Sequence, residues 1–321
     1  MTPSLQATEP LFDFDHAFDR LDFSRTIDKS LVHRRALAEV FITDFESVSR
    51  DRYIVAAQLP VGHAYYNDGN TNFHDPLAII EACRQAALVV AHQYYGVPKD
   101  WSFIFRKAKV HIGHIDSTII SDGRMLVGIN ITKTFEKDGF LTGMIGDFVV
   151  EIDGNKVGDF VGSLSFLPSA MLKKMRAQAR SVKNISDKPY ISPLQPLAAK
   201  RVARTSAKNI VIGRTSRDTY EIVDCRSNRA LIDHEVDHIS GMVIMEACRQ
   251  AAIATVLEDT GELYGTVKSF QVEFLEFAEH ELPTVCKAHL IDIVDGVAQT
   301  HIEILQQNQI LASSQIDLQG V

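Results

Sequence analysis

The chain of 321 residues has the length of about two ordinary domains, and its 45% hydrophobic and 23% charged residues exclude a disordered chain. Its formal net charge of -8 at pH 7 excludes a protein built mainly to coat nucleic acid, because that task requires a basic surface to displace phosphate counterions. No stretch of about 20 apolar residues occurs, and the N-terminus lacks a basic segment followed by an apolar core, so neither a membrane protein nor a secreted one is expected.

The cysteines are few and widely spaced, and they contain no Cys-x-x-Cys pair. Neither a disulfide framework nor a metal site is therefore expected, and the reducing cytoplasm is the predicted location. The sequence also lacks a glycine-rich phosphate loop and a dinucleotide fingerprint, so no cofactor is expected.

Residues 1–30 are predicted to form an N-terminal arm, in which Phe12, Phe14, Phe18 and Phe23 interleave with acidic residues. Two interpretations stay open. The arm is either a strap packed on the domain that follows it or a segment that binds a partner.

A first repeat is predicted over residues 31–168. It opens with two segments rich in Val, Ile and Phe, which predict a strand pair at 32–43 and 53–58 with a polar break at 44–51 between them. The next segment, 61–75, has the His, Tyr, Asn, Asp and Gly composition of a loop.

A helix is predicted from Pro76 to about Tyr95, because Pro suits the first helical position and Asp75 can cap the exposed amides. This helix is apolar nearly all round, so it should be buried nearly all round. Four segments with strand composition follow it: 103–115, 125–134, 140–152 and 156–167. Together they predict an antiparallel sheet wrapped around a central helix.

Residues 169–200 are predicted to form a basic linker that includes a short amphipathic helix. From Met171 to Arg204 the chain carries nine Lys or Arg and one Asp, although the protein as a whole is acidic. The segment is either a solvated linker or a surface that meets an acidic carrier protein, since complementary charge steers encounter.

A second repeat, residues 201–321, is indicated by an identical heptad. Glu81-Ala82-Cys83-Arg84-Gln85-Ala86-Ala87 recurs as Glu246-Ala247-Cys248-Arg249-Gln250-Ala251-Ala252. Such identity predicts one structural unit used twice. The expected second set of elements is a strand at 202–213, a short strand at 220–225, a loop at 233–240, a helix at 241–258, and strands at 267–277, 283–293, 297–305 and 310–318. In the loops we match His63 with His234, which makes the first loop six residues longer.

Glu81, Arg84 and Gln85 share one helix face, because they stand at positions i, i+3 and i+4, and the second heptad repeats this arrangement with Glu246, Arg249 and Gln250. Charges in so apolar a helix are costly unless they are paired or functional. They form either a buried pair that sets helix register or repeat pairing, or a general acid/base and substrate clamp whose carboxyl pKa is raised by burial. Cys83 and Cys248 point the other way and are predicted to pack in the core.

Two Asp-His pairs precede the second helix, and their histidines His234 and His238 are expected to line a cleft and to act in proton transfer. Gly241 at the helix start lets amide hydrogens approach a developing oxyanion. The first helix has Pro76 there, which removes one amide. We therefore expect unequal sites, with the main chemistry at the second repeat.

Several stretches carry a family resemblance: Leu31-Val32-His33-Arg34, Asp75-Pro76-Leu77 ahead of the first heptad, and Asp237-His238-Ile239-Ser240-Gly241-Met242-Val243 ahead of the second. A long apolar helix wrapped by an antiparallel sheet resembles the hotdog fold, and the quoted motifs resemble those of the AfsA family of A-factor (gamma-butyrolactone autoregulator) biosynthesis proteins. The resemblance implies an α+β double hotdog. The sequence departs from the family pattern at Ser240, where Pro is common, and in the loop from Tyr65 to His74.

The resemblance also implies an acyltransferase. Its expected reaction moves a beta-ketoacyl group from an acyl-carrier-protein or CoA thioester to the hydroxyl of dihydroxyacetone phosphate. Catalytic roles are implied for Glu81, Glu246 and Arg249. Substrate binding is expected from a wider set: Arg84, Gln85, Gln250, His63, His234, His238 and Gly241. No nucleic-acid, membrane or metal partner is expected, and the oligomeric state is left open.

Two alternatives stay open from the sequence. One is a hotdog dehydratase or thioesterase, in which a His and a Glu act on a thioester without an acceptor. The other is a protein that binds acyl chains or lactone signals and has no catalytic activity.

Overall fold

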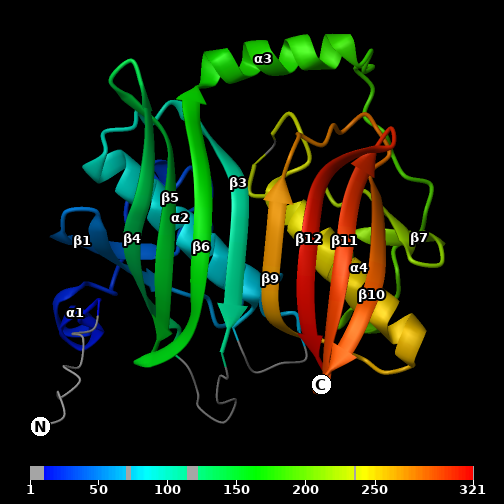
Figure 1. Ribbon diagram of the computed structural model, residues 1–321, viewed down its shortest axis with the longest axis horizontal. Coiled ribbons are helices and arrows are strands. Elements are labelled where there is room, and N and C mark those ends of the chain that lie inside the picture. The colour runs from blue at the N-terminus through cyan, green and yellow to red at the C-terminus, as the bar shows by residue number, and fades with distance from the viewer. Residues whose placement is uncertain (1–10, 70–73, 114–121, 235, 321) are drawn as a thin grey trace, which may run out of the picture.

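The computed structural model describes residues 11–69, 74–113, 122–234 and 236–320, so part of the loop expected from Tyr65 to His74 lies outside the described residues. Within these ranges the strands form one antiparallel sheet, in the order β1-β2-β4-β5-β6-β3-β9-β12-β11-β10-β8-β7 (Figure 1). The bounds are β1 Ile42–Ser49, β2 Arg52–Gln58, β3 Trp101–Ile112, β4 Arg124–Lys137, β5 Phe140–Ile152, β6 Asn155–Pro168, β7 Ile212–Ser216, β8 Thr219–Ile222, β9 Thr266–Phe274, β10 Val285–Val294, β11 Val297–Gln306 and β12 Gln309–Gln319.

The sheet has two halves that run in mirrored order from a central pair. That pair is β3 and β9, which bond antiparallel from Lys107 opposite Glu273 to His111 opposite Ser269. The long helix α2, Pro76–Tyr94, crosses the first half, and α4, Gly241–Thr260, crosses the second half on the same side of the sheet (Figure 1). Each half is therefore a sheet wrapped around one helix.

Both long helices are buried nearly all round, as their composition predicts. The Asp75 carboxylate accepts the Leu77 amide at 2.8 Å and caps α2, which confirms the predicted helix start. Ser240 caps α4 in the corresponding place by accepting the Val243 amide at 3.4 Å. Among the described residues, no helix is long and apolar enough to span a membrane.

The strands before each helix differ from the expectation. Residues 44–49, predicted as a polar break, belong to β1, and the stretch before Ile42 holds 3₁₀ turns at Lys29–Leu31 and Leu37–Glu39. The second repeat does the same, with 3₁₀ turns at Ala199–Val202 and Ala207–Asn209 before β7. Polar residues suit β1 because it is an edge strand with an exposed end. Of the apolar residues in the two turns before it, Leu31 is buried and Leu37 is exposed.

The N-terminal arm packs on the chain itself. It contains a short helix α1, Phe14–Arg20, and its buried residues Phe12 and Phe14 join a cluster with Ile54 of β2 and Leu126 of β4. The described part of the arm is therefore packed on the domain that follows it, which is the strap of the two interpretations.

The predicted amphipathic helix of the linker is α3, Ser169–Val182, which extends from the end of β6 toward the second half of the sheet (Figure 1). Its basic residues bind acidic residues of the second repeat: Arg176 contacts Asp237 and Glu279, and Lys183 contacts Glu276. Much of the positive charge expected to face a carrier protein is therefore neutralised within the chain.

Candidate functional site

The first heptad lies in a buried charged cluster that we call the first centre, formed by Glu81, Arg84, Gln85 and Arg34. Glu81 is only 1% exposed, and it accepts hydrogen bonds from Arg34 Nε at 3.1 Å, Arg84 Nε at 2.8 Å and Gln85 Nε2 at 2.7 Å. Burial opposes ionisation, but the guanidiniums of Arg34 and Arg84 outweigh it and lower the pKa of Glu81 to about 2.

The second heptad forms a matching cluster, the second centre, around a fully buried Glu246. Arg204 donates to Glu246 Oε1 through Nε at 3.1 Å and Nη2 at 3.0 Å, and Arg249 and Gln250 also donate to this carboxylate. The Tyr65 hydroxyl donates to Oε2 at 2.8 Å. The predicted sharing of one helix face is confirmed in both repeats, but the carboxylates are enclosed and do not line an open cleft.

Asp75 distinguishes the second centre from the first. Its carboxylate accepts Arg249 Nη1 at 2.7 Å and lies 3.5 Å from Arg204 Nη2. Burial raises the pKa of Glu246 to about 7; the Asp75 carboxylate adds to the rise and Arg204 opposes it. The two glutamates therefore differ in protonation: Glu81 favours the ionised form, whereas Glu246 takes up a proton near neutral pH.

Gln85 and Gln250 each bridge the carboxylate to the backbone of a preceding turn. Gln85 accepts the Phe41 amide at 2.9 Å and donates to the Glu39 carbonyl at 2.8 Å. Gln250 repeats both bonds with Val211 and Asn209, at 3.0 and 2.8 Å. Their amide groups are therefore engaged by the protein, where the sequence suggested substrate contact.

The loops before the helices are exchanged between the repeats. Asp68 of the first loop accepts the amides of Thr205 and Ser206, which follow Arg204, at 3.2 and 2.8 Å. Asp233 of the second loop accepts the amides of Arg35 and Ala36, which follow Arg34, both at 2.8 Å. Each repeat thus holds the arginine-bearing turn of the other.

This exchange corrects the matching of the loops. Asp68 lies 13 residues before Glu81, and Asp233 lies 13 residues before Glu246, so the first loop is not six residues longer over this part. His63, which contacts Glu39 at 3.2 Å, corresponds to Asn228 and not to His234. His63 and His234 therefore occupy different places in their loops. Asp68 and Asp233 occupy the same place, because each caps the arginine-bearing turn of the other repeat.

The two Asp-His pairs serve the contacts between elements. His234 bonds the Asp233 carboxylate that caps the turn after Arg34, at 2.8 Å. His238 bonds Asp237, which also binds Arg176 of α3, and its ring contacts Phe277 at 4.8 Å. His238 therefore lies at the α3 contact, and none of the contacts recorded for it among the described residues reaches a carboxylate of either centre.

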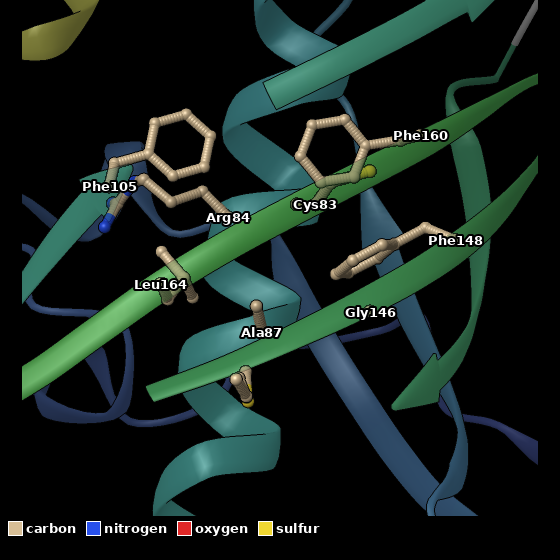
Figure 2. A pocket seen from close by; sticks show the side chains of 10 residues that line it. Cys83, Arg84, Ala87, Phe105, Gly146, Phe148, Phe160 and Leu164 are labelled. Atoms are coloured by element: carbon tan, nitrogen blue, oxygen red, sulfur yellow. The ribbon is translucent and has the colours of Figure 1, made fainter. Parts of the chain in front are cut away.

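An apolar pocket adjoins the first centre, between α2 and the sheet. Figure 2 shows Cys83, Arg84 and Ala87 of α2 facing Phe148 of β5 and Leu164 of β6. The wall also contains two glycines, Gly146 and Gly162, where side chains would crowd the neighbouring rings. Cys83 thus faces the sheet as predicted, and burial raises the pKa of its thiol.

Two aromatic rings connect Gly241 with this pocket. A Cβ at Gly241 would lie 3.4 Å from Phe274, and the Phe274 ring contacts Phe105 at 6.0 Å between centroids. Phe105 lines the pocket beside Arg84. The start of α4 is therefore connected with the pocket wall of the other repeat through these two rings.

Four residues of the centres were not singled out for a site by the sequence: Arg34, Arg204, Tyr65 and Asp75. The sequence did carry a signal for the arginines, because Val32-His33-Arg34 and Val202-Ala203-Arg204 share a Val-x-Arg pattern. In the structure the middle residue of both has left-handed backbone, with φ 54 in each case. Tyr65 and Asp75 have no counterpart of the same type in the second repeat. Their role follows from contacts between the repeats.

A family model described as the A-factor biosynthesis hotdog domain matches residues 16–142 and 186–319. A relative from Streptomyces virginiae, named 2-oxo-3-(phosphooxy)propyl 3-oxoalkanoate synthase, is 26% identical over 304 residues, which cover 92% of this chain and 98% of the relative. One of the same name from Streptomyces coelicolor is 26% identical and covers 80% of each chain. The solved 12:0-ACP thioesterase from Umbellularia californica is 11% identical, with a TM-score of 0.48, and covers 84% of this chain and 94% of its own.

Proposed function

The chain belongs to the A-factor biosynthesis hotdog family, and we propose that it transfers a beta-ketoacyl group from an acyl thioester to the hydroxyl of dihydroxyacetone phosphate. The predicted α+β double hotdog is confirmed by the family and by the two helix-centred halves of the sheet. The name of these relatives describes an ester of a 3-oxoalkanoate with a phosphooxy-propanone alcohol. That ester is the product of the proposed reaction.

The observation that carries the proposal is an apolar pocket with one charged residue in its wall. The pocket beside Cys83 and Ala87 is lined by aromatic and aliphatic side chains and by Arg84, which is bound to the buried Glu81. An acyl thioester combines matching properties, an apolar chain and polar carbonyl groups. We assign this place to the acyl chain. The pocket as it stands has room for about one water molecule, so its aromatic side chains must move apart when the chain binds.

Glu246 is the proposed general base. Its pKa of about 7 suits a group that must take up a proton near neutral pH, whereas Glu81, with a pKa of about 2, stays ionised and holds Arg84. The Tyr65 hydroxyl already donates to Glu246 Oε2 at 2.8 Å. The acceptor hydroxyl takes this position when Tyr65 withdraws.

The reaction then balances in two steps. Glu246 removes the proton of the acceptor hydroxyl while the hydroxyl oxygen attacks the thioester carbonyl carbon. Arg249 orients the Glu246 carboxylate to which it is bound. The tetrahedral oxyanion then re-forms the carbonyl and the carbon–sulfur bond breaks. The departing sulfur takes the proton back from the Glu246 carboxyl and leaves as a thiol, which restores the Glu246 carboxylate. Amides at the start of α4, near Gly241, are the proposed donors to the oxyanion.

The experiment is incubation of the whole chain with a beta-ketoacyl thioester and dihydroxyacetone phosphate, followed by mass spectrometry of the products. We expect a phosphorylated ester, and we expect Glu246→Gln to lower its rate of formation about a hundredfold or more, as for loss of a general base. Acyl-carrier-protein and CoA donors are compared in parallel. Glu258→Gln, on the same helix but partly exposed and paired with Arg201, is the control.

Three outcomes would overturn the proposal. Free acid alone identifies a thioesterase, and a dehydrated thioester identifies a dehydratase. Retention of the thioester without turnover, equal in wild type and Glu246→Gln, identifies a binding protein.

A further inference from the structure

The two heptad arginines are identical in sequence position but differ in what their outer edges meet. Arg249 donates Nη2 to its own Glu246 and Nη1 to Asp75 at 2.7 Å. Arg84 donates Nε and Nη2 to Glu81, and in the described part of the chain no partner is recorded for its Nη1. The Arg84 side chain is 21% exposed, against 8% for Arg249.

The difference originates at the helix caps. Asp75 caps α2 six residues before Glu81, and Ser240 caps α4 six residues before Glu246. Arg249 reaches across to the cap of α2 in the other repeat. If the repeats are arranged alike, Arg84 faces the cap of α4 in the same way, and there Ser240 supplies no negative charge.

The aromatic contacts support this placement. Gly241 follows Ser240 and lies against Phe274, which contacts Phe105 in the wall that Arg84 also lines. The Phe274 and Phe105 rings therefore connect the start of α4 with the pocket wall that contains Arg84. The anion subsite is assigned to the Arg84 guanidinium, because the amides at the start of α4 are already assigned to the oxyanion.

The charges of the two centres differ by one. The second centre sets two guanidiniums, Arg204 and Arg249, against two carboxylates, Glu246 and Asp75. The first sets Arg34 and Arg84 against Glu81 alone. Each arginine-bearing turn is capped by an aspartate, Asp233 or Asp68, so these do not change the comparison. Glu39 is not counted, because among the described residues its carboxylate contacts His63 and neither guanidinium of the first centre.

We propose that Arg84 Nη1, opposite Ser240, is the subsite for the phosphate of the acceptor, and that Asp75 fills the equivalent place at Arg249. The assignment to phosphate rests on the proposed function; the anion subsite rests on the contacts and charges alone. A phosphate supplies the missing negative charge and accepts the N–H groups of a guanidinium.

The test is a calorimetric titration of the intact chain with inorganic phosphate, in Ser240→Asp and Ser240→Asn. These two side chains have similar shape and both cap helices, so their difference isolates the charge. We expect phosphate to bind about tenfold or more weaker to Ser240→Asp than to Ser240→Asn, because the new carboxylate occupies the edge of Arg84. Equal affinities would refute the subsite.

A reciprocal variant tests the role of Asp75. Asp75→Asn keeps a capping side chain but leaves two buried guanidiniums in the second centre against one carboxylate. Phosphate should bind at a second place in this variant, seen as increased stoichiometry and as a rise in Tm with phosphate that exceeds that of wild type. An unchanged stoichiometry would show that Asp75 holds no anion site.

Kinetics separate this inference from the acyltransferase proposal. If the chain makes the phosphorylated ester, Ser240→Asp should raise KM for dihydroxyacetone phosphate relative to Ser240→Asn and leave KM for the thioester unchanged. A rise in KM for the thioester alone would assign the subsite to the donor and overturn the phosphate assignment. Phosphate titration needs no turnover, so it judges the subsite even if no ester forms.

Discussion

Glu81 and Glu246 occupy identical sequence contexts, yet their surroundings push their pKa values apart. Glu81 meets two guanidiniums without a second carboxylate, which lowers its pKa to about 2. Glu246 shares its guanidiniums with Asp75 in a fully buried place, where burial raises its pKa to about 7. The charged cap Asp75, which the second repeat replaces by Ser240, contributes to the separation of the two pKa values.

The proposed base predicts a pH dependence of the rate. Glu246 accepts a proton only when ionised, so kcat/KM should be low at acidic pH, rise as pH passes about 7, and then level off. Glu246→Gln should lack this rise in its residual rate. Steady-state rates from pH 5 to 9 check it, and a wild-type profile that stays flat across this range would contradict the assignment.

The pKa shifts of Glu246 and Glu81 change the stability of the protein in opposite directions as pH rises. The folded state favours protonated Glu246, so this group's contribution is fully present below its ordinary pKa of 4.5 and is lost as pH rises through about 7. Glu81 contributes stability above its ordinary pKa of 4.5, and this is lost as pH falls through about 2. The stability contributed by these two glutamates is therefore greatest under mildly acidic conditions, whereas the transfer rate should be greatest at higher pH.

Among the elements, α3 shows how a sequence pattern can indicate a helix and leave its partners undecided. Arg176 is 4% exposed and lies over the Phe277 ring at 4.5 Å while it binds Glu279 at 2.9 Å. Arg180 binds Glu279 and Glu281. These pairs attach the linker to the second repeat.

Arg176→Ala should destabilise the protein by about 3–5 kcal/mol, because it leaves the buried Glu279 carboxylate with less compensation. Lys173→Ala removes an exposed cation from the same helix and should change stability by less than about 0.5 kcal/mol. Urea unfolding measures both variants. Similar midpoints for the two would mean that the Arg176 contacts contribute nothing measurable.

At the scale of the whole molecule, the repeats form one unit through exchanged loops and the β3–β9 pair. Asp68 and Asp233 each cap the turn that carries the other repeat's arginine, Arg204 or Arg34. The centres thus exist only when both repeats are present, because each takes a positioning contact from its neighbour.

Asp68→Ala and Asp233→Ala should each lower the free energy of unfolding by about 1–3 kcal/mol, since each leaves two backbone amides without their acceptor. Their functional effects should differ. Asp68→Ala loosens Arg204 and so should lower the transfer rate, whereas Asp233→Ala loosens Arg34 and should weaken phosphate binding. Asp19→Ala, an exposed carboxylate in α1, is the control for both measurements. Identical functional profiles for the two variants would contradict separate roles.

The sequence by itself determined the duplication, the two central helices and most of the strands. Identity between the heptads and apolar residues all round the helices are local signals, and they survive folding because burial is decided largely by composition and period. The shared face of Glu81, Arg84 and Gln85 is also local, since helix geometry alone brings i, i+3 and i+4 together. The edge strand β1 was misjudged because exposure removes the apolar pattern that marks a strand.

Only the tertiary structure decided which distant groups neutralise the buried charges. Arg34 reaches Glu81 from 47 positions away, and Tyr65 and Asp75 reach the second heptad from 181 and 174 positions away. A buried carboxylate must find a donor, but periodicity does not say which one. The inequality of the two centres therefore arises from contacts between the repeats, where one cap is charged and the other is not.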